Sequence, residues 1–224
     1  MNYHNVKEGR FLSRPNRFIA MVQIEGRVEV CHVKNTGRCR ELLVPGAAVY
    51  LEESPKPDRK TKYDLIAVQK GDRLINMDSQ APNRVALEWL PTYFSGLTSV
   101  RPETVYGHSR FDLSFEYEGK KAFMEVKGVT LERDGVVLFP DAPTERGVKH
   151  LLELCDAAKA GYEAWVLFVI QMKDVKYFVP NEETHPAFAK ALRTARAAGV
   201  RLMALDCEVL PDRLTADSEV AIRL

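Results

Sequence analysis

The first third of the chain alternates short apolar runs with turn residues, a pattern typical of β-strands. Gly26 lies between two such runs and predicts a hairpin, while Pro45-Gly46 and Gly71-Asp72 mark later turns. Strands are predicted at 19–25, 28–33, 47–52, 65–69 and 74–77. Several short strands in close succession are typical of a small barrel. We therefore interpret residues 1–80 as an OB-like β-barrel domain.

After residue 80 the hydrophobic pattern changes to a mixture of helices and strands. Asn83 and Thr144 are candidate N-caps for two helices, the first reaching Trp89 or Tyr93 and the second about Ala160. Strands are predicted at 110–117, 121–129, 136–139, 164–170 and 201–207, and a third helix at 185–198. One of these strands is apolar throughout, as in a strand covered on both faces. We interpret residues 81–224 as an α/β domain with a mixed sheet.

Composition and charge narrow the class of protein. The chain has 224 residues, of which 46% are hydrophobic and 28% charged, which excludes a disordered or fibrous protein. Residues 1–80 carry 14 Lys and Arg against 10 Asp and Glu (+4), and residues 81–224 carry 18 against 21 (−3). The four cysteines form no CxxC pair, so a zinc ribbon is unsupported. With no signal-peptide core and no apolar run of membrane-spanning length, we expect a cytoplasmic protein without membrane contact.

The segment 109–127 carries the main candidate chemistry. If Glu118-Gly119 forms a two-residue hairpin turn, Asp112 lies directly opposite Glu125, with Cβ atoms about 4.5–5.5 Å apart. The other face is wholly apolar and fixes this register; it consists of Phe111, Leu113 and Phe115 opposite Val126, Met124 and Ala122. Two facing carboxylates require a raised pKa, a neighbouring cation or a bridging metal ion.

Oxygen ligands favour Mg²⁺ or Mn²⁺ between these carboxylates. Lys127 follows Glu125 by two residues, on the same face, where it can orient a water molecule or stabilise charge on a phosphate. The alternative is a solvated polar face in which Asp112, Glu125, Arg110 and Lys127 form salt pairs.

The predicted second helix carries a basic stripe. Arg146, Lys149 and His150 are three and four residues apart and share one side, which can meet backbone phosphates, and His150 is a candidate for proton transfer. The alternative is an ordinary exposed face in which Glu145 pairs with Lys149. Asp141 precedes this helix and is interpreted as its cap or as a further acidic ligand.

The predicted barrel interleaves basic and aromatic residues. OB-like barrels bind nucleic acid through a basic groove with aromatic stacking platforms. The candidate phosphate contacts of this domain are Arg14, Arg17, Lys34, Arg38 and Arg40. The alternative is a solubilising surface over a core that contains the aromatic side chains. Asn35-Thr36-Gly37 predicts a turn within this basic segment.

A series of motifs spans most of the chain in order. They are Arg14-Pro-Asn-Arg17-Phe18, Asn35-Thr36-Gly37, Ala81-Pro82-Asn83-Arg84, Ser109-Arg110-Phe111-Asp112, Glu125-Val126-Lys127, Phe139-Pro140-Asp141-Ala142, the segment from Thr144 to Leu151, and Phe168-Val-Ile-Gln171. Together they resemble the sugar fermentation stimulation protein A family, and Asp112…Glu125-x-Lys127 resembles the PD-(D/E)xK nuclease-like core. Phe111 stands where that core often has proline.

The resemblance implies an N-terminal OB-like domain and a C-terminal nuclease-like domain, DNA binding without strong sequence preference, and a role in regulating sugar catabolism. It implies that Asp112, Glu125 and the Val126 carbonyl bind the metal ion and that Lys127 is the catalytic lysine. Glu88 is a candidate further carboxylate or a helix-surface residue. Gln171 either reaches the site at the sheet edge or simply leaves the core.

Two functions follow from these expectations, with DNA as the partner of both. The first is a metal-dependent DNA phosphodiesterase that uses Mg²⁺ or Mn²⁺. The second is a non-catalytic DNA-binding regulator of sugar catabolism genes. A protein-interaction module without nucleic acid is a third alternative, which the near-neutral net charge of +1 allows. No oligomeric state is predicted.

Overall fold

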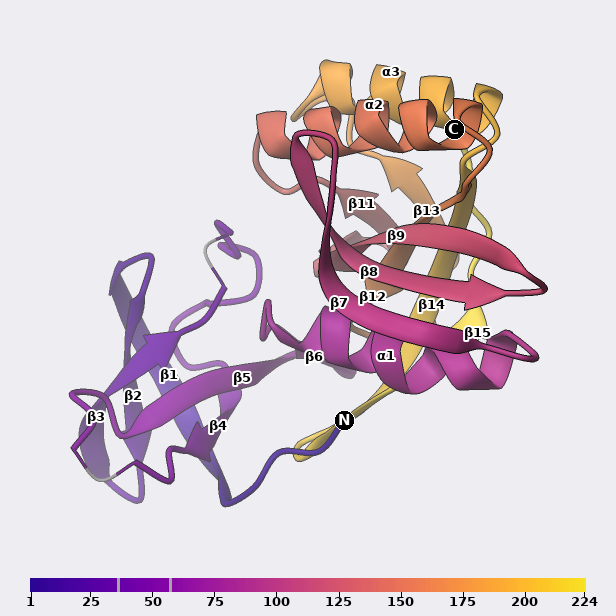
Figure 1. Cartoon of the computed structure of the whole chain (residues 1–224). Coiled ribbons are helices and arrows are strands. Elements are labelled where there is room, and N and C mark those ends of the chain that lie inside the picture. The colour runs from indigo at the N-terminus through magenta and orange to yellow at the C-terminus, as the bar shows by residue number, and fades with distance from the viewer. Residues whose placement is uncertain (36, 57) are drawn as a thin grey trace.

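The N-terminal part of the protein is a closed barrel (Figure 1). The computed structural model describes residues 1–35, 37–56 and 58–224. Its first six strands are β1 (Val6–Asn16), β2 (Ile19–Ile24), β3 (Arg27–Val33), β4 (Ala48–Glu53), β5 (Tyr63–Lys70) and β6 (Arg73–Asn76). They follow the sheet order β3-β2-β1-β4-β5-β6, and a parallel pairing of β3 with β5 closes the first five into a barrel. The OB-like barrel is thus confirmed.

The barrel contains a strand that the sequence pattern did not predict. In β1 only Gly9 and Phe11 are buried, so its polar and charged residues hide the alternation expected of a strand. Gly9 packs so closely on β2 that a Cβ atom there would lie 2.6 Å from Cγ1 of Val22. The predicted strand 74–77 corresponds to β6, which pairs with β5 but takes no part in closing the barrel.

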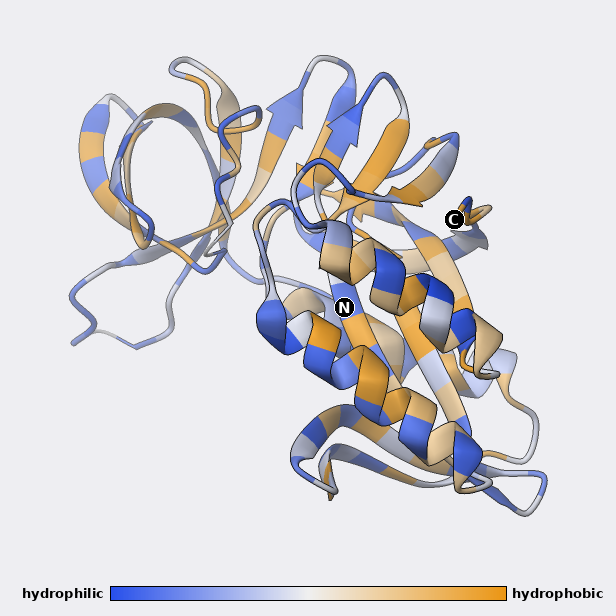
Figure 2. Cartoon of the chain, turned by 90° about the horizontal axis from the view of Figure 1, so that it is seen from above, coloured by the Kyte–Doolittle hydropathy of each residue, from blue (hydrophilic) through white to orange (hydrophobic). Residues whose placement is uncertain are grey.

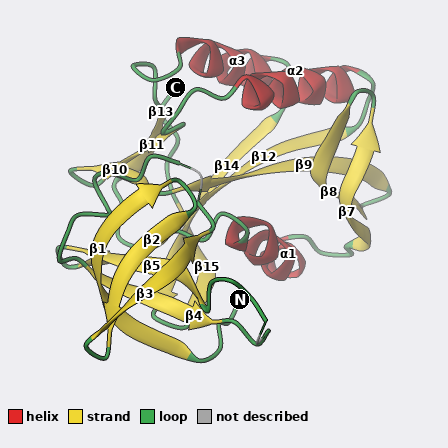
Figure 3. Ribbon diagram, turned by 90° about the vertical axis from the view of Figure 1, so that its left-hand side faces the viewer, coloured by secondary structure: helices red, strands yellow, loops and turns green. Residues whose placement is uncertain are grey.

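The C-terminal part is a mixed sheet covered by helices on both faces (Figures 1 and 3). Its elements are α1 (Ala81–Tyr93), β7 (Thr98–Tyr106), β8 (Ser109–Tyr117), β9 (Lys120–Val129), β10 (Leu131–Arg133), β11 (Val136–Phe139), α2 (Glu145–Lys159), β12 (Glu163–Ile170), β13 (Tyr177–Pro180), α3 (Pro186–Ala197), β14 (Arg201–Leu210) and β15 (Arg213–Glu219). The sheet order is β15-β14-β12-β9-β8-β7, in which β9, β12 and β14 are parallel neighbours. The predicted mixed sheet is confirmed.

The helices lie on opposite sides of this sheet, with α1 on one face and α2 and α3 on the other (Figure 1). Figure 2 shows hydrophobic and hydrophilic residues mixed along α2 and α3, as expected of helices with one buried face. Strands β10, β11 and β13 form a second, smaller sheet. Within the described ranges, no helix is both long and apolar enough to cross a membrane.

Two local predictions for this part were wrong. Strand β7 was missed because it is largely exposed and carries Pro102, as befits the edge of a sheet. Helix α1 begins at Ala81 rather than after Asn83, because Pro82 is well tolerated in a first helical turn. The predicted cap of α2 is confirmed: Thr144 Oγ1 accepts a hydrogen bond from the Gly147 N–H at 3.1 Å.

The two parts of the protein are joined at more than one point. Residue Asn2 forms a β-bridge with Arg213, and the Tyr3 N–H donates to the Asp212 carbonyl at 2.8 Å. At the other end of the barrel segment, the Asn76 N–H donates to the Gln171 carbonyl at 2.9 Å. The first residues of the chain therefore contact the C-terminal sheet before the barrel begins.

Candidate metal centre and nucleic-acid interface

The β8–β9 hairpin has the predicted register over most of its length. Glu118 and Gly119 form its turn, and both have positive φ values of 49° and 73°. Positive φ at both central residues is the geometry that matches the twist of a two-residue hairpin. The antiparallel pairing extends from this turn to Leu113 opposite Met124, as predicted.

The pairing of β8 with β9 ends at Leu113 and Met124, one pair before the predicted pair of Asp112 and Glu125. Asp112 Oδ2 instead accepts a hydrogen bond from the Val126 N–H at 2.9 Å, and Oδ1 accepts one from Asn83 Nδ2 of α1 at 3.1 Å. Phe111 does not lie on the predicted apolar face, because it packs on Phe123 with ring centroids 5.4 Å apart. A side-chain hydrogen bond thus replaces strand pairing where the hairpin becomes polar.

Glu125 lies in the interior beside this aspartate, with only 2% of its surface exposed. Its Oε1 atom contacts Nζ of Lys127 at 2.5 Å and Nδ1 of His150. Its Oε2 atom is buried and has no hydrogen-bond partner among the described residues. Burial alone would raise the pKa of Glu125, but His150 and Lys127 outweigh burial and lower it.

The pKa of Asp112 is shifted in the opposite direction. Burial raises it, and the nearby negative charge of Glu125 raises it further. Both hydrogen-bond donors to Asp112 are neutral amides, and no Lys, Arg or His of the described residues forms an ion pair with this carboxylate. Neighbouring carboxylates with opposed pKa shifts are a feature of catalytic sites.

We tested whether these residues fit a divalent cation. The unpartnered Oε2 of Glu125 is a buried acceptor, which is costly unless a ligand engages it. No group of three or more His, Cys, Asp and Glu side chains suited to a metal ion occurs within the described ranges. Mg²⁺ commonly binds proteins through one or two carboxylates and retains several waters. Asp112 and Glu125 fit a cation of that kind.

Two further predicted ligands do not lie at this centre. Glu88 is on α1, but its half-exposed carboxylate pairs with the amino group of Met1. Asp141 neither caps α2 nor contacts Glu125; its Oδ2 accepts a hydrogen bond from the Arg38 N–H of the barrel at 3.1 Å. Val126 is predicted to bind the metal ion through its carbonyl oxygen. The structure shows a different contact of this residue, a hydrogen bond from its N–H to Asp112.

The basic stripe of α2 borders the same centre. Arg146 Nε lies 3.4 Å from Nε2 of the buried His150, so this histidine connects an exposed arginine to Glu125. Lys149 is exposed and pairs with Glu153 at 3.8 Å rather than with Glu145. The expected pair is absent because Glu145 contacts His185 of the α3 N-terminus at 3.1 Å instead. Arg110 is also exposed, 3.5 Å from Glu103 of β7.

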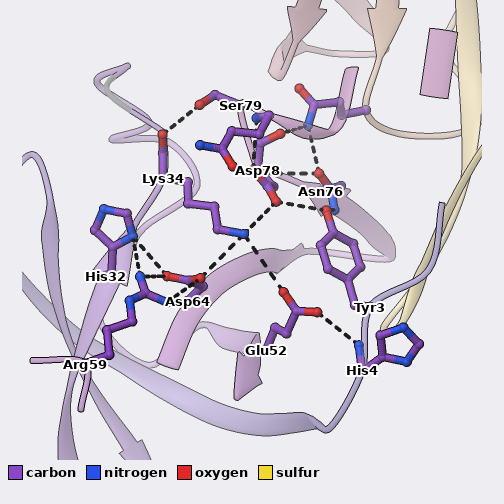
Figure 4. A network of polar contacts seen from close by, with 12 residues as sticks. Tyr3, His4, His32, Lys34, Glu52, Arg59, Asp64, Asn76, Asp78 and Ser79 are labelled. Atoms are coloured by element: carbon purple, nitrogen blue, oxygen red, sulfur yellow. Dashed lines mark hydrogen bonds and ion pairs between the residues drawn. The ribbon is translucent and has the colours of Figure 1, made fainter. Parts of the chain in front are cut away.

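Two of the five predicted phosphate contacts in the barrel are engaged inside the protein. Arg14 donates to four main-chain carbonyls, those of Arg17, Asn35, Gly37 and Arg38, and so holds two loops together. Lys34 Nζ lies 3.1 Å from Asp78, 3.5 Å from Asp64 and 3.9 Å from Glu52 (Figure 4). Both cations already have partners within the protein, so they are less available to an external phosphate than exposed arginines are, and their predicted DNA contacts stay a prediction.

The other three barrel arginines remain at the surface. Arg17, Arg38 and Arg40 are exposed and line a cavity of about 360 Å³ beside the loop that Arg14 fastens. In that loop Asn35 Oδ1 accepts a hydrogen bond from the Gly37 N–H at 2.8 Å, as in a side-chain-stabilised turn. Thr36 of the predicted turn lies outside the described residues.

Gln171 is buried at the junction of the two parts and not at the pair of carboxylates. Its Nε2 atom donates to Oδ1 of Asn76 at 2.8 Å and to the carbonyl of Asp78 at 3.0 Å. The residue that the sequence reasoning missed is Asn83, which orients Asp112. Asn83 belongs to the Ala81-Pro82-Asn83-Arg84 motif, but its position in the sequence predicts a helix cap and not a contact with Asp112.

A five-stranded barrel followed by a mixed sheet with an Asp…Glu-x-Lys hairpin defines a protein that joins an OB domain to a domain of the nuclease-like kind. Residues 12–77 match the family model of the SfsA N-terminal OB domain, and residues 80–213 match that of the sugar fermentation stimulation protein RE domain. The chain therefore belongs to the sugar fermentation stimulation protein family.

Individual relatives cover the chain from end to end. A sugar fermentation stimulation protein homolog of Desulfitobacterium hafniense (strain Y51) is 60% identical, with 100% of this chain and 99% of the relative covered. A homolog of Ruminiclostridium cellulolyticum is 55% identical, with both chains fully covered. The solved structure of Pyrococcus furiosus SfsA in complex with Ca²⁺ matches with a TM-score of 0.88 and 28% identity, covering 100% of this chain and 98% of that one.

Proposed function

We propose that this protein is a metal-dependent DNA phosphodiesterase whose site is the hairpin centre of Asp112, Glu125 and Lys127. The observation that carries the proposal is the buried, unpartnered Oε2 of Glu125 beside a second, half-buried carboxylate, that of Asp112. Lys127 and His150 contact only the other oxygen of Glu125, so a metal ion at Oε2 and Asp112 would offset the repulsion between the two carboxylates. The similar SfsA of Pyrococcus furiosus was solved with Ca²⁺, which supports divalent-cation binding here.

Each residue of the centre has a separate role in the proposal. Asp112 and Glu125 hold the metal ion, which supplies positive charge against the phosphate and lowers the pKa of water. Asn83 orients Asp112 from α1, and His150 orients Glu125 from α2. Lys127 Nζ, now on Glu125, is close enough to turn toward a non-bridging phosphate oxygen and to stabilise its developing charge.

The DNA surface of the proposal consists of the cations that stay exposed. Near the centre these are Arg110, Arg146 and Lys149, and on the barrel they are Arg17, Arg38 and Arg40. Contacts from such side chains to phosphates make binding strongly salt-dependent and give no sequence preference of their own.

The test combines cleavage and cation binding in the same samples. Purified protein is incubated with single- and double-stranded DNA, with Mg²⁺, with Mn²⁺ and with a chelator, beside the variants Asp112→Asn and Lys127→Met. Glu116→Gln serves as the matched control, since Glu116 is exposed on the same strand and faces Lys121. We expect metal-dependent cleavage in the wild type and the control, and its loss in the two site variants.

A melting curve in Ca²⁺ gives a readout independent of turnover. A cation that binds only the folded protein raises its stability by about 2.7 kcal/mol at one hundred times the dissociation constant. The wild type should therefore melt at a higher temperature in Ca²⁺, and Asp112→Asn should not. Intact DNA binding without cleavage in any metal ion would contradict the proposal.

That contrary result would favour the second candidate, a non-catalytic DNA-binding regulator of sugar catabolism genes. One observation favours it: Lys127 and His150 already contact Glu125, so part of its charge is balanced by the protein itself. In that case DNA binding would be unchanged in Asp112→Asn and Lys127→Met.

A further inference from the structure

A second polar cavity lies where the barrel meets the mixed sheet, outside the centre described above. Its volume is about 110 Å³, and its walls come from the end of β9, from the β10–β11 hairpin and from the segments that lead out of the barrel. Gly128, which directly follows Lys127 on β9, forms part of the wall. The cavity therefore begins one residue from the proposed catalytic lysine.

Gln171 presents a fixed acceptor to this cavity. The side chain is 1% exposed, and its Nε2 donates to Asn76 and to the main-chain carbonyl of Asp78, which can only accept. The amide orientation is therefore fixed, and Oε1 is the atom that points away from these partners. Oε1 lies against Gly128, where a Cβ atom would come within 2.6 Å of it. It has no hydrogen-bond partner in the described part of the chain.

Asp141 supplies a negative charge to the same cavity. One of its oxygens accepts the Arg38 N–H, and no Lys, Arg or His side chain of the described ranges lies within ion-pair distance of it. Thr130 also lines the cavity, and its hydroxyl has no hydrogen-bond partner among the described residues. The two acceptors that are free to bind a ligand, Oε1 of Gln171 and the Asp141 carboxylate, suit a ligand that presents N–H donors.

The other side of the cavity is apolar. It is formed by Leu131, Leu138 and Phe139. A single water needs only about 10–15 Å³, and a cavity of about 150 Å³ accommodates benzene. The junction cavity, at about 110 Å³, is smaller than that but opens to solvent, so it suits the edge of an aromatic ring system whose remainder lies outside. A hydrated ion fits less well, because it would gain nothing from the apolar wall.

The surroundings of the cavity identify the class of ring. The loop that contains Gly37 and Arg38 separates it from the cavity lined by Arg17, Arg38 and Arg40. A nucleic-acid strand that crosses this loop would place phosphates on the arginine side and a base on the acceptor side. A base with an exocyclic amino group offers the required donors, and guanine offers two side by side, at N1 and N2.

We propose that the junction cavity receives the amino-bearing edge of one unstacked nucleobase, guanine in first place, through Asp141 and Gln171. The inference rests on the proposed action on DNA and gives that otherwise sequence-tolerant site a preference at a single position. Extrusion of one base from a stack into a protein pocket is a general device of enzymes that act on nucleic acid.

The experiment compares two fluorescent oligonucleotides, dT15 and the same strand with one central dG, by anisotropy titration in a chelator so that nothing is cleaved. We expect the dG strand to bind about tenfold more tightly, as for one well-formed bidentate contact. Strands with one central dC or dA should bind between these limits. Asp141→Asn should remove the preference while it retains an acceptor for the Arg38 N–H.

Two further variants keep the test decisive. Thr130→Val removes one cavity hydroxyl without changing the side-chain shape and should weaken the preference, which provides a second variant if Asp141→Asn fails to fold. Asp156→Asn, at an exposed position of α2, is the matched control and should keep the preference. Equal binding of both strands by the wild type, or a preference that survives in both cavity variants, would overturn this inference and leave the proposed function standing. Binding of neither strand would also overturn this inference, and the cleavage test on double-stranded DNA would decide the proposed function separately.

Discussion

Two of the charge clusters among the described residues differ in how completely their oxygen atoms are engaged. At the junction of the two parts, Lys34 contacts Asp64, Asp78 and Glu52 (Figure 4). The remaining carboxylate oxygens there are also occupied, by Arg59 and His32 on Asp64 and by main-chain N–H groups on the other two. Each acceptor in this junction cluster has a partner within the described chain.

The hairpin cluster of Asp112, Glu125, Lys127 and His150 is incomplete by the same measure. Lys127 and His150 both contact one oxygen of Glu125 and leave the other without a partner. Asp112 is bound only by neutral donors. A buried polar network in which every group has a partner stabilises the fold. In an incomplete network the unpaired group is destabilising, and a ligand that pairs with it gains binding free energy. The difference separates a structural network from a candidate site without reference to sequence.

Among the substitutions that test the difference between the two clusters, Glu125→Gln is expected to have the largest effect. Cleavage should fall by about 1,000-fold, which corresponds to roughly 4 kcal/mol, because the metal ion loses a charged ligand. The free energy of unfolding in a chelator should also fall, because the lowered pKa of Glu125 means that Lys127 and His150 stabilise its charge in the folded protein. Single-turnover cleavage and urea unfolding measure the two quantities. A variant that loses stability but keeps its cleavage per folded molecule would show that Glu125 is structural.

A different result is expected for Lys34→Met in the junction cluster. Removal of this ammonium leaves Asp78 and Glu52 without a cationic partner, while Asp64 keeps Arg59, and the protein should lose about 3 kcal/mol of stability. Cleavage per folded molecule should not change. Urea unfolding gives the stability, and Lys56→Met, a change at an exposed lysine of the barrel, is the control. A Lys34→Met variant of normal stability with weakened DNA binding would show that this lysine is a phosphate contact.

The smallest effect concerns pH. Burial raises the pKa of Asp64, but Arg59, His32 and Lys34 outweigh burial and hold it below its usual value of 3.8. Because the folded pKa is the lower one, the stabilisation is complete well above 3.8 and is lost as the pH falls through and below that value. Asp64→Asn should lower stability by about 1 kcal/mol at pH 7 and by less at pH 3. Urea unfolding at both pH values measures this, with Asp156→Asn as a control that shows no such change.

The hairpin shows how far a periodic pattern can be followed. Alternation of apolar and polar residues is enough to fix the register as far as Leu113 and Met124, because a slip of one residue would expose the apolar face. The pattern fails at Asp112, where a side chain takes the place of a main-chain partner. Strands β1 and β7 were missed for a related reason, since polar edge and barrel strands lack the alternation on which the prediction depends.

The candidate site was predictable where chemistry and spacing coincide. Glu125, Lys127 and His150 were all selected from the sequence, and the structure brings them into contact. The internal contacts of Arg14 and Lys34 could not be predicted, because a sequence does not show which carbonyls or carboxylates will lie against a given cation. Exposure, which decides whether a basic side chain is available to DNA, is a property of the folded chain.

The position of the barrel within the chain has a further consequence. Asn2 and Tyr3 pair with the β14–β15 region, and Asn76 pairs with Gln171, so the barrel is attached to the mixed sheet through both of its ends. Topologically it is an insertion and not a module on a single tether. Two attachments remove most of the swivelling that one linker allows, so the arginines of the barrel stay at a nearly constant effective concentration relative to the β8–β9 hairpin. A nucleic acid held by the barrel would then meet the hairpin as an intramolecular partner, without a second search.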